Sequence, residues 1–126
     1  MESTASIEQL HEELQSWKHE LSSFKHEIRD FESHLENLAR KKLPRELLAH
    51  VEHFQNSFIC QKEVIDHLRH DLPDSRHKVE NIFHSMRKAE TDQADGRDEL
   101  RERMDTCRKI YSEMREDFRK FESKYN

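Results

Sequence analysis

The hydrophobic residues in the first third of the chain recur at alternating spacings of three and four. They are Ile7, Leu10, Leu14, Trp17, Leu21, Phe24, Ile28, Phe31, Leu35 and Leu38. A repeat that averages 3.5 residues keeps one seam of a helix against its neighbours while the helices supercoil. We therefore predict a long helix over about residues 6–42, with Trp17 buried on its seam.

The second predicted helix lies between the two prolines of the chain. Pro44 suits the first turn of a helix, because its ring fixes a helical φ and no N–H is needed there, whereas Pro73 ends the pattern. The seam of this helix, widened by Leu48 and Val64, consists of Leu47, Val51, Phe54, Phe58, Gln61, Ile65, Leu68 and Leu72. We predict a helix over about residues 45–72, in which Gln61 is the one polar residue on the seam.

The rest of the chain keeps one heptad register but becomes polar in the middle of it. The register runs through Val79, Phe83, Met86, Glu90, Gln93, Arg97, Leu100, Met104, Cys107, Tyr111, Met114, Phe118, Phe121 and Tyr125. The only glycine, Gly96, lies in the polar stretch and could mark a loop. A loop has no reason to preserve heptad phase, however, and one glycine costs a helix only about 1 kcal/mol. The unbroken register therefore favours a single helix over about residues 75–125.

Together these patterns predict an all-α fold, with residues 1–126 forming one helical-bundle domain. We predict an antiparallel three-helix, coiled-coil-like bundle with a long C-terminal helix, and the alternative is a four-helix bundle with a break near Gly96. The polar seam residues either form a buried network that fixes the register or are solvated: Gln61, Glu90, Gln93 and Arg97. The pattern leaves both open.

A continuous third helix would be longer than the first two, so its last turns would project beyond them. That segment carries a hydrophobic stripe: Met104, Cys107, Tyr111, Met114, Phe118, Phe121 and Tyr125. An exposed stripe of this size is typical of an interface. We therefore predict that these seven residues hold a homodimer, or bind another helical protein, whereas the four-helix alternative would bury them within one chain.

Composition limits the possible partners and the compartment. Hydrophobic residues make up 33% of the chain and charged residues 39%, with a net charge of −5 and no long basic run, so we expect no nucleic-acid partner. No hydrophobic run is long enough to cross a membrane, and the first residues do not look like a secretion signal. Cys60 and Cys107 form neither a metal-ligand pair nor a disulfide framework by spacing, so we expect a cytoplasmic protein.

Ten histidines are the most unusual feature of the composition. They are His11, His19, His26, His34, His50, His53, His67, His70, His77 and His84. Helical bundles hold metals through Glu-x-x-His pairs that project inward, but none of these histidines falls on a predicted seam. The pattern favours solvated surface side chains over a metal site. Protonation of all ten would move the net charge from −5 to +5, which would also suit a response to pH.

No catalytic constellation is visible in the sequence. One glycine leaves no room for a Gly-rich phosphate loop, and neither cysteine lies in a nucleophile arrangement. We therefore predict a non-enzymatic protein-interaction or structural bundle without a cofactor. The alternative is a helical-bundle metal-binding protein that uses its His and Glu side chains.

Overall fold

The computed structural model describes residues 2–73, 76–88 and 96–125. These residues form four helices: α1 (Glu2–Ala39), α2 (Arg45–Asp71), α3 (Arg76–Lys88) and α4 (Gly96–Tyr125). The described ranges contain no strand, so the prediction of an all-α helical bundle is confirmed. In the same ranges, no helix is both long and apolar enough to cross a membrane.

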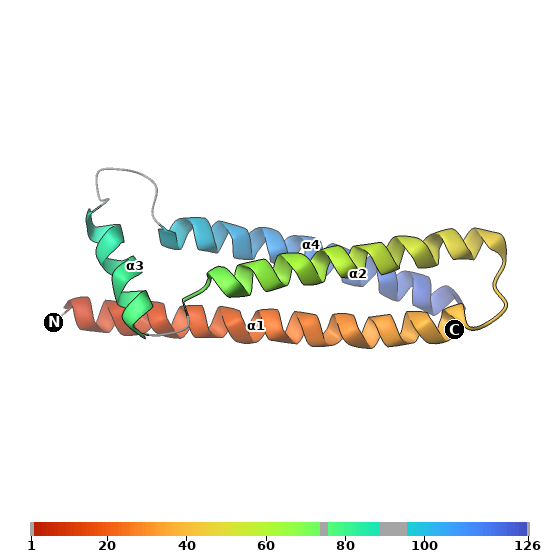
Figure 1. Cartoon of the computed structure of the whole chain (residues 1–126), viewed down its shortest axis with the longest axis horizontal. Helices are drawn as coiled ribbons and strands as arrows, with labels where there is room; N and C mark the ends of the chain where they lie inside the picture. Colours follow the sequence, from red (N-terminus) through yellow and green to blue (C-terminus); the bar gives the residue numbers. More distant parts are fainter. Residues whose placement is uncertain (1, 74–75, 89–95, 126) are drawn as a thin grey trace.

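Three long helices lie side by side, and the short helix α3 crosses one end of them (Figure 1). The chain reverses between α1 and α2, so these two helices are antiparallel, and α4 runs in the same direction as α1. Ion pairs agree with this arrangement. Lys25 of α1 contacts Asp66 of α2 at 2.6 Å, and Glu32 contacts Lys62 at 2.8 Å, so residue numbers rise on one helix as they fall on the other.

The predicted third helix is present as two helices that lie at a large angle to each other (Figure 1). The alternative with a break near Gly96 therefore describes this part of the chain, and a straight helix over residues 75–125 does not. The physical reason lies in the polar stretch of the register, which offers no hydrophobic side chain to hold a straight helix on its neighbours. Glu90 and Gln93 lie outside the described residues, as does the side chain of Arg97.

The predicted seams of α1 and α2 form the core. The eight residues of the second seam are buried, and so are eight of the ten on α1; Ile7 and Phe24 are partly buried. The widening of the second seam was predicted wrongly, because Leu48 and Val64 are 46% and 44% exposed. Trp17 is 6% exposed, which confirms its predicted burial. A cluster of five aromatic rings joins α1, α2 and α4 toward the C-terminal end of α4: Phe31, Phe54, Phe58, Phe118 and Phe121.

The ends of α2 follow from its two flanking prolines. Pro44 is the residue before the helix, and its carbonyl oxygen accepts a hydrogen bond of 3.0 Å from the N–H of Leu47. At the other end Leu72 has extended backbone, as expected for the residue before a proline, and its N–H still donates to the carbonyl of Leu68. Both ends of α2 are therefore determined by the local sequence.

Candidate functional site

The predicted interface stripe lies inside the chain. Tyr125 is 39% exposed, but the other six residues are buried: Met104, Cys107, Tyr111, Met114, Phe118 and Phe121. The prediction of an exposed stripe was wrong. The separate helix α4 begins at Gly96 and runs alongside α1 and α2 (Figure 1), so its residues do not project beyond these helices. A homodimer stays a prediction, but it would need a different surface.

The parallel helices α1 and α4 are joined by polar contacts at intervals of seven residues, which we call the α1/α4 ladder. Three of its four rungs are the ion pairs Glu13–Arg101 (3.0 Å), Glu20–Arg108 (2.7 Å) and Glu27–Arg115 (3.2 Å), and the fourth is the hydrogen bond between His34 and Glu122 (2.8 Å). In every rung the residue on α4 lies 88 positions after its partner on α1. A constant offset means that the two helices run in parallel and in register, so each rung supports the same alignment.

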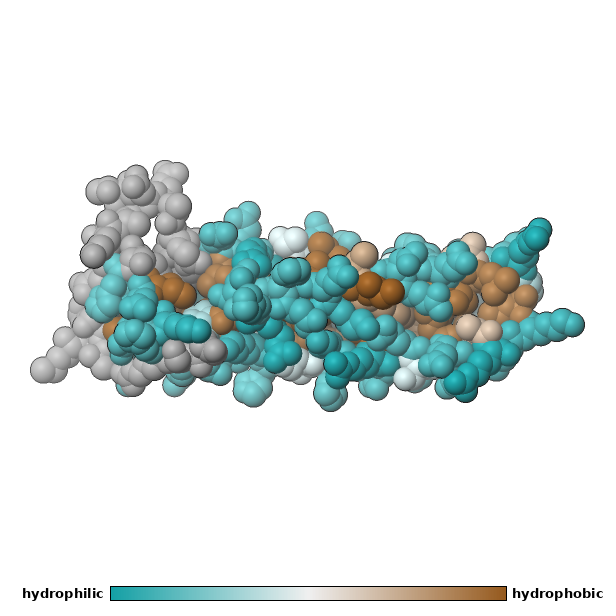
Figure 2. Space-filling model, viewed as in Figure 1, coloured by the Kyte–Doolittle hydropathy of each residue, from teal (hydrophilic) through white to brown (hydrophobic). Residues whose placement is uncertain are grey.

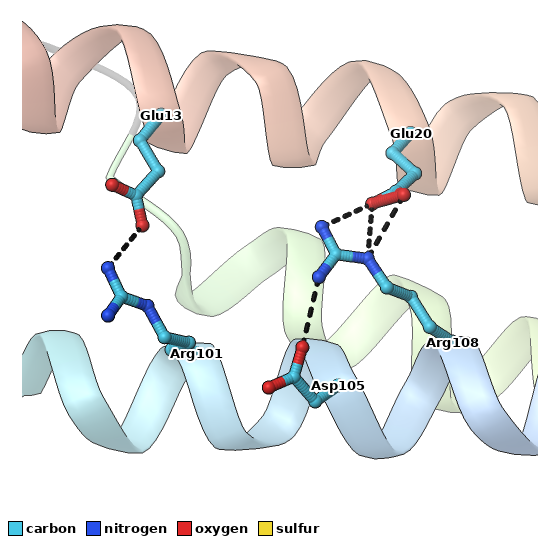
Figure 3. A network of polar contacts seen from close by, with 5 residues as sticks. All are labelled: Glu13, Glu20, Arg101, Asp105 and Arg108. Atoms are coloured by element: carbon cyan, nitrogen blue, oxygen red, sulfur yellow. Dashed lines mark hydrogen bonds and ion pairs between the residues drawn. The ribbon is translucent and has the colours of Figure 1, made fainter.

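The Arg108 rung has the most contacts (Figure 3). The Nε of Arg108 donates to both carboxylate oxygens of Glu20, at 2.8 and 3.0 Å, and its Nη1 donates to Asp105 at 3.0 Å. The hydrogen bond to Glu20 raises the pKa of the Arg108 guanidinium. These side chains are about one-third exposed, where a single ion pair contributes little stability, so the ladder acts mainly by selecting the register.

We expect the double substitution Arg101→Glu with Arg108→Glu to destabilise the bundle by roughly 1–3 kcal/mol, because it replaces two attractions with two repulsions. Adding Glu13→Arg and Glu20→Arg reverses both rungs and should restore most of that loss. Urea unfolding followed by circular dichroism measures both changes. If the four-residue exchange were no more stable than the double variant, these charges would not face each other in solution.

Tyr111 connects the ladder to the core. Its ring stacks on Phe24, with ring centres 4.0 Å apart and planes 17° from parallel, and its hydroxyl donates a hydrogen bond to Glu27. The same carboxylate contacts Arg115 at 3.2 Å and Arg119 at 3.8 Å. Burial, and then the hydrogen bond to the Glu27 carboxylate, raise the pKa of the Tyr111 phenol well above its usual value. Tyr111 is therefore expected to stay neutral while the chain is folded.

A raised pKa makes stability depend on alkaline pH. The contribution of the neutral Tyr111 phenol is fully present below the unfolded pKa of about 10 and is lost as the pH rises toward the higher folded pKa. We expect the free energy of unfolding of the wild type to fall more steeply above about pH 10 than that of Tyr111→Phe. Urea titrations of both proteins across this range make the comparison, and parallel curves would show that the phenol is not held neutral by the fold.

On the opposite side of α4 a groove separates it from α2, which we call the α2/α4 groove. Its α2 side includes Cys60, Gln61, Val64 and His67, and its α4 side includes Glu99, Glu102, Ile110, Glu113 and Asp117. It consists of two hollows of about 490 and 410 Å³ that both touch Ile110, so they adjoin there. Figure 2 shows hydrophobic side chains reaching the surface over α2 and α4 in an otherwise hydrophilic face.

Gln61 lies on the seam of α2 and lines this groove. It is 6% exposed, and its Oε1 is buried without a hydrogen-bond partner among the described residues. A buried amide oxygen without a hydrogen bond lowers the free energy of unfolding, because it has lost its water and gained no partner. Gln61 is therefore not at this position for the stability of the core alone. The predicted position of Gln61 on the buried seam is confirmed, but its Oε1 joins no hydrogen-bonded network among the described residues.

The histidines lie off the seams, as predicted. Nine are exposed and His11 is partly buried. In the part of the chain that the structure describes, no three His, Cys, Asp or Glu side chains are arranged to hold a metal ion. No observation favours the metal-binding alternative over the interaction protein. Cys60 is exposed and Cys107 is buried, both thiols are free, and burial raises the pKa of the Cys107 thiol.

The chain matches no protein-family model, no curated protein and no solved structure. Function therefore has to be inferred from the surfaces themselves.

The α1/α4 ladder and the α2/α4 groove were not predicted from the sequence. The ladder had a visible signal, since Glu13, Glu20 and Glu27 repeat every seven residues, and Arg101, Arg108 and Arg115 do the same. The groove had none, because residue spacing does not show that Val64 and Ile110 both stay exposed between α2 and α4.

Proposed function

We propose that this chain is a non-enzymatic interaction protein, a helical bundle that presents a surface to other proteins. The observation that carries the proposal is the α2/α4 groove, where Val64 and Ile110 are 44% and 43% exposed on a bundle whose other faces are densely charged. Isolated exposed hydrophobic residues are ordinary, but a continuous groove that contains them is typical of a binding surface.

The distribution of the other polar residues supports the same proposal. The charges between α1 and α4 pair with each other along the ladder, and those between α1 and α2 include the Lys25–Asp66 and Lys62–Glu32 pairs. These two helix pairs are closed by contacts within the chain. Between α2 and α4, in contrast, the described residues leave exposed hydrophobic side chains along a groove. A partner that covers these side chains would remove them from water, so this is the surface on which we expect binding.

The compartment that we propose is the cytoplasm. Support comes from the two free thiols, one of them exposed at Cys60, because cytosolic proteins are kept reduced. An exposed thiol in an oxidising compartment would be open to intermolecular disulfide formation.

The experiment that tests the function is separation of native extracts by size, with the untagged chain followed by antibody. We expect the chain to elute well above its own mass of 15.4 kDa together with a second protein in constant ratio. Elution at the mass of the bundle alone, with nothing enriched beside it, would contradict an interaction role. Sedimentation of the purified chain at tens of micromolar then distinguishes a homodimer from a complex with another protein.

A further inference from the structure

The α2/α4 groove has two chemically different sides, and this difference defines what it can bind. Its α4 side carries four carboxylates, from Glu99, Glu102, Glu113 and Asp117. None of the four forms an ion pair with another described residue, whereas the one arginine on this side, Arg103, is already neutralised by Asp71 at 2.8 Å. The α4 side is therefore acidic along its length.

The α2 side of the groove carries no carboxylate among the described residues that line it. It offers the small or neutral side chains of Asn56, Ser57 and Cys60, with His53 and His67 toward the two ends. Between the two sides lies a hydrophobic floor, in which Val64 and Ile110 are half-exposed over buried Leu68 and Met114. A ligand for this surface needs a hydrophobic stripe with positive charge along one flank.

The length of the groove favours a helix as the element that carries this stripe. From Glu99 to Asp117 it extends about 27 Å along α4, which is the length of roughly 18 residues of α-helix. Three long helices packed side by side also leave a groove that a fourth helix fills in a four-helix bundle. The hydrophobic residues of such a helix would recur at spacings of three and four.

From these features we propose that the α2/α4 groove binds a basic amphipathic helix of a partner protein. This rests on the proposed interaction function and adds the surface and the chemistry of the partner. Lysine or arginine side chains on one flank of that helix pair with the carboxylates of α4, and its hydrophobic stripe covers Val64 and Ile110. Gln61 lies in the floor of the groove, and its buried Oε1 is without a hydrogen-bond partner among the described residues.

Charge also decides between this partner and a second copy of the chain. A copy docked antiparallel by the same surface would bring its own four carboxylates against these four, and a copy docked parallel would face them with an α2 side whose described lining residues include no lysine or arginine. Like charges facing each other oppose association, whereas a basic flank removes the repulsion and adds attraction. The groove therefore suits a different, basic partner better than it suits itself.

The probe for the test is a pair of synthetic helical peptides of about 18 residues. Both carry leucine at alternating spacings of three and four, and their flanking positions hold lysine in one peptide and glutamate in the other. Cys60 provides the signal, because it lines the groove and is exposed, whereas Cys107 is buried. We expect the lysine peptide to slow modification of the Cys60 thiol in the full-length chain in a saturable way, and the glutamate peptide to have no effect.

Two substitutions in the groove and two matched controls make the result specific. Ile110→Ser and the pair Glu102→Lys with Glu113→Lys should each weaken the lysine peptide about ten-fold or more, and the charge reversal should allow the glutamate peptide to bind. Ile59→Ser and Glu52→Lys change an equally exposed isoleucine and another exposed carboxylate outside the groove, so they should leave binding unchanged.

Three outcomes would overturn the proposal. One is no protection of Cys60 by the lysine peptide, and another is equal weakening by the groove and control substitutions. The third is a homodimer of the purified chain that Ile110→Ser dissociates, which would make a second copy the occupant. If native extracts still contained a partner that binds Ile110→Ser normally, the interaction function would stand and only this surface would be wrong.

Discussion

Replacing Phe118 with glutamate is expected to unfold the bundle rather than to separate a dimer. Phe118 is 1% exposed, and its ring centre lies 4.9 Å from that of Phe31 and 5.1 Å from that of Phe58, so it contacts both other long helices. A carboxylate at this position would be buried among aromatic rings without a partner, which costs more than a typical domain can lose. Phe118→Ala, which only removes volume, should cost about 3–5 kcal/mol.

Circular dichroism at increasing urea concentration distinguishes these cases. We expect Phe118→Glu to lose its cooperative transition and Phe118→Ala to keep one at a lower midpoint. The matched control is Tyr125→Glu, which changes the same heptad stripe at a residue that is 39% exposed and should alter stability by only about 0.5 kcal/mol. A folded Phe118→Glu protein with a normal midpoint and a lower sedimentation coefficient would instead support the stripe as an intermolecular interface.

The seams of α1 and α2 could be predicted because their heptads are continuous and bounded by proline. In such a helix the 3.5-residue average fixes which side is buried, whatever the neighbour is. The same reasoning failed after Val79. Heptad phase is conserved across Glu90 and Arg97, but phase alone supplies no packing energy where the seam side chains are polar, so continuity of register did not guarantee a continuous helix.

The wrong prediction of an exposed interface stripe followed from the wrong prediction of a straight third helix. Once a straight helix over residues 75–125 was assumed, its end had to project, and the hydrophobic stripe had to be exposed. In the structure α3 lies across the end of the bundle, with Val79 buried and Ile82 and Phe83 partly buried against the core. α4 can then run beside α1 along its length, so the stripe completes the core of its own chain.

The ladder and the groove show what sequence patterns leave out. Heptad-spaced glutamates and arginines are visible in the sequence. Predicting that Glu20 pairs with Arg108 also requires the position of α4 along α1, and this position depends on the path of the chain through α3. The groove depends on two hydrophobic residues beside the seams, Val64 and Ile110, which stay 44% and 43% exposed between α2 and α4. Their residue types alone do not show that they are half-exposed.

The remaining large effect is expected at Trp17, the only tryptophan of the chain. It is 6% exposed, between Leu14 and Leu21, which are 1% and 0% exposed on the same seam. The Glu13–Arg101 and Glu20–Arg108 rungs lie on either side of it, so α4 passes Trp17 at the level of buried Met104. The indole therefore lies in the core at the level where these two rungs join α1 to α4.

We expect Trp17→Ala to lower the free energy of unfolding by about 3–5 kcal/mol, because the buried side chains around the indole can close the cavity only in part. Trp17→Phe keeps most of the ring volume and should lose less. Leu48→Ala is the control, since that leucine is 46% exposed and its loss should change stability by only about 0.5 kcal/mol. Urea unfolding followed by circular dichroism compares all three with the wild type. A midpoint for Trp17→Ala as high as that for Leu48→Ala would mean that Trp17 does not fill the core at this level, and the first predicted seam would be wrong at this residue.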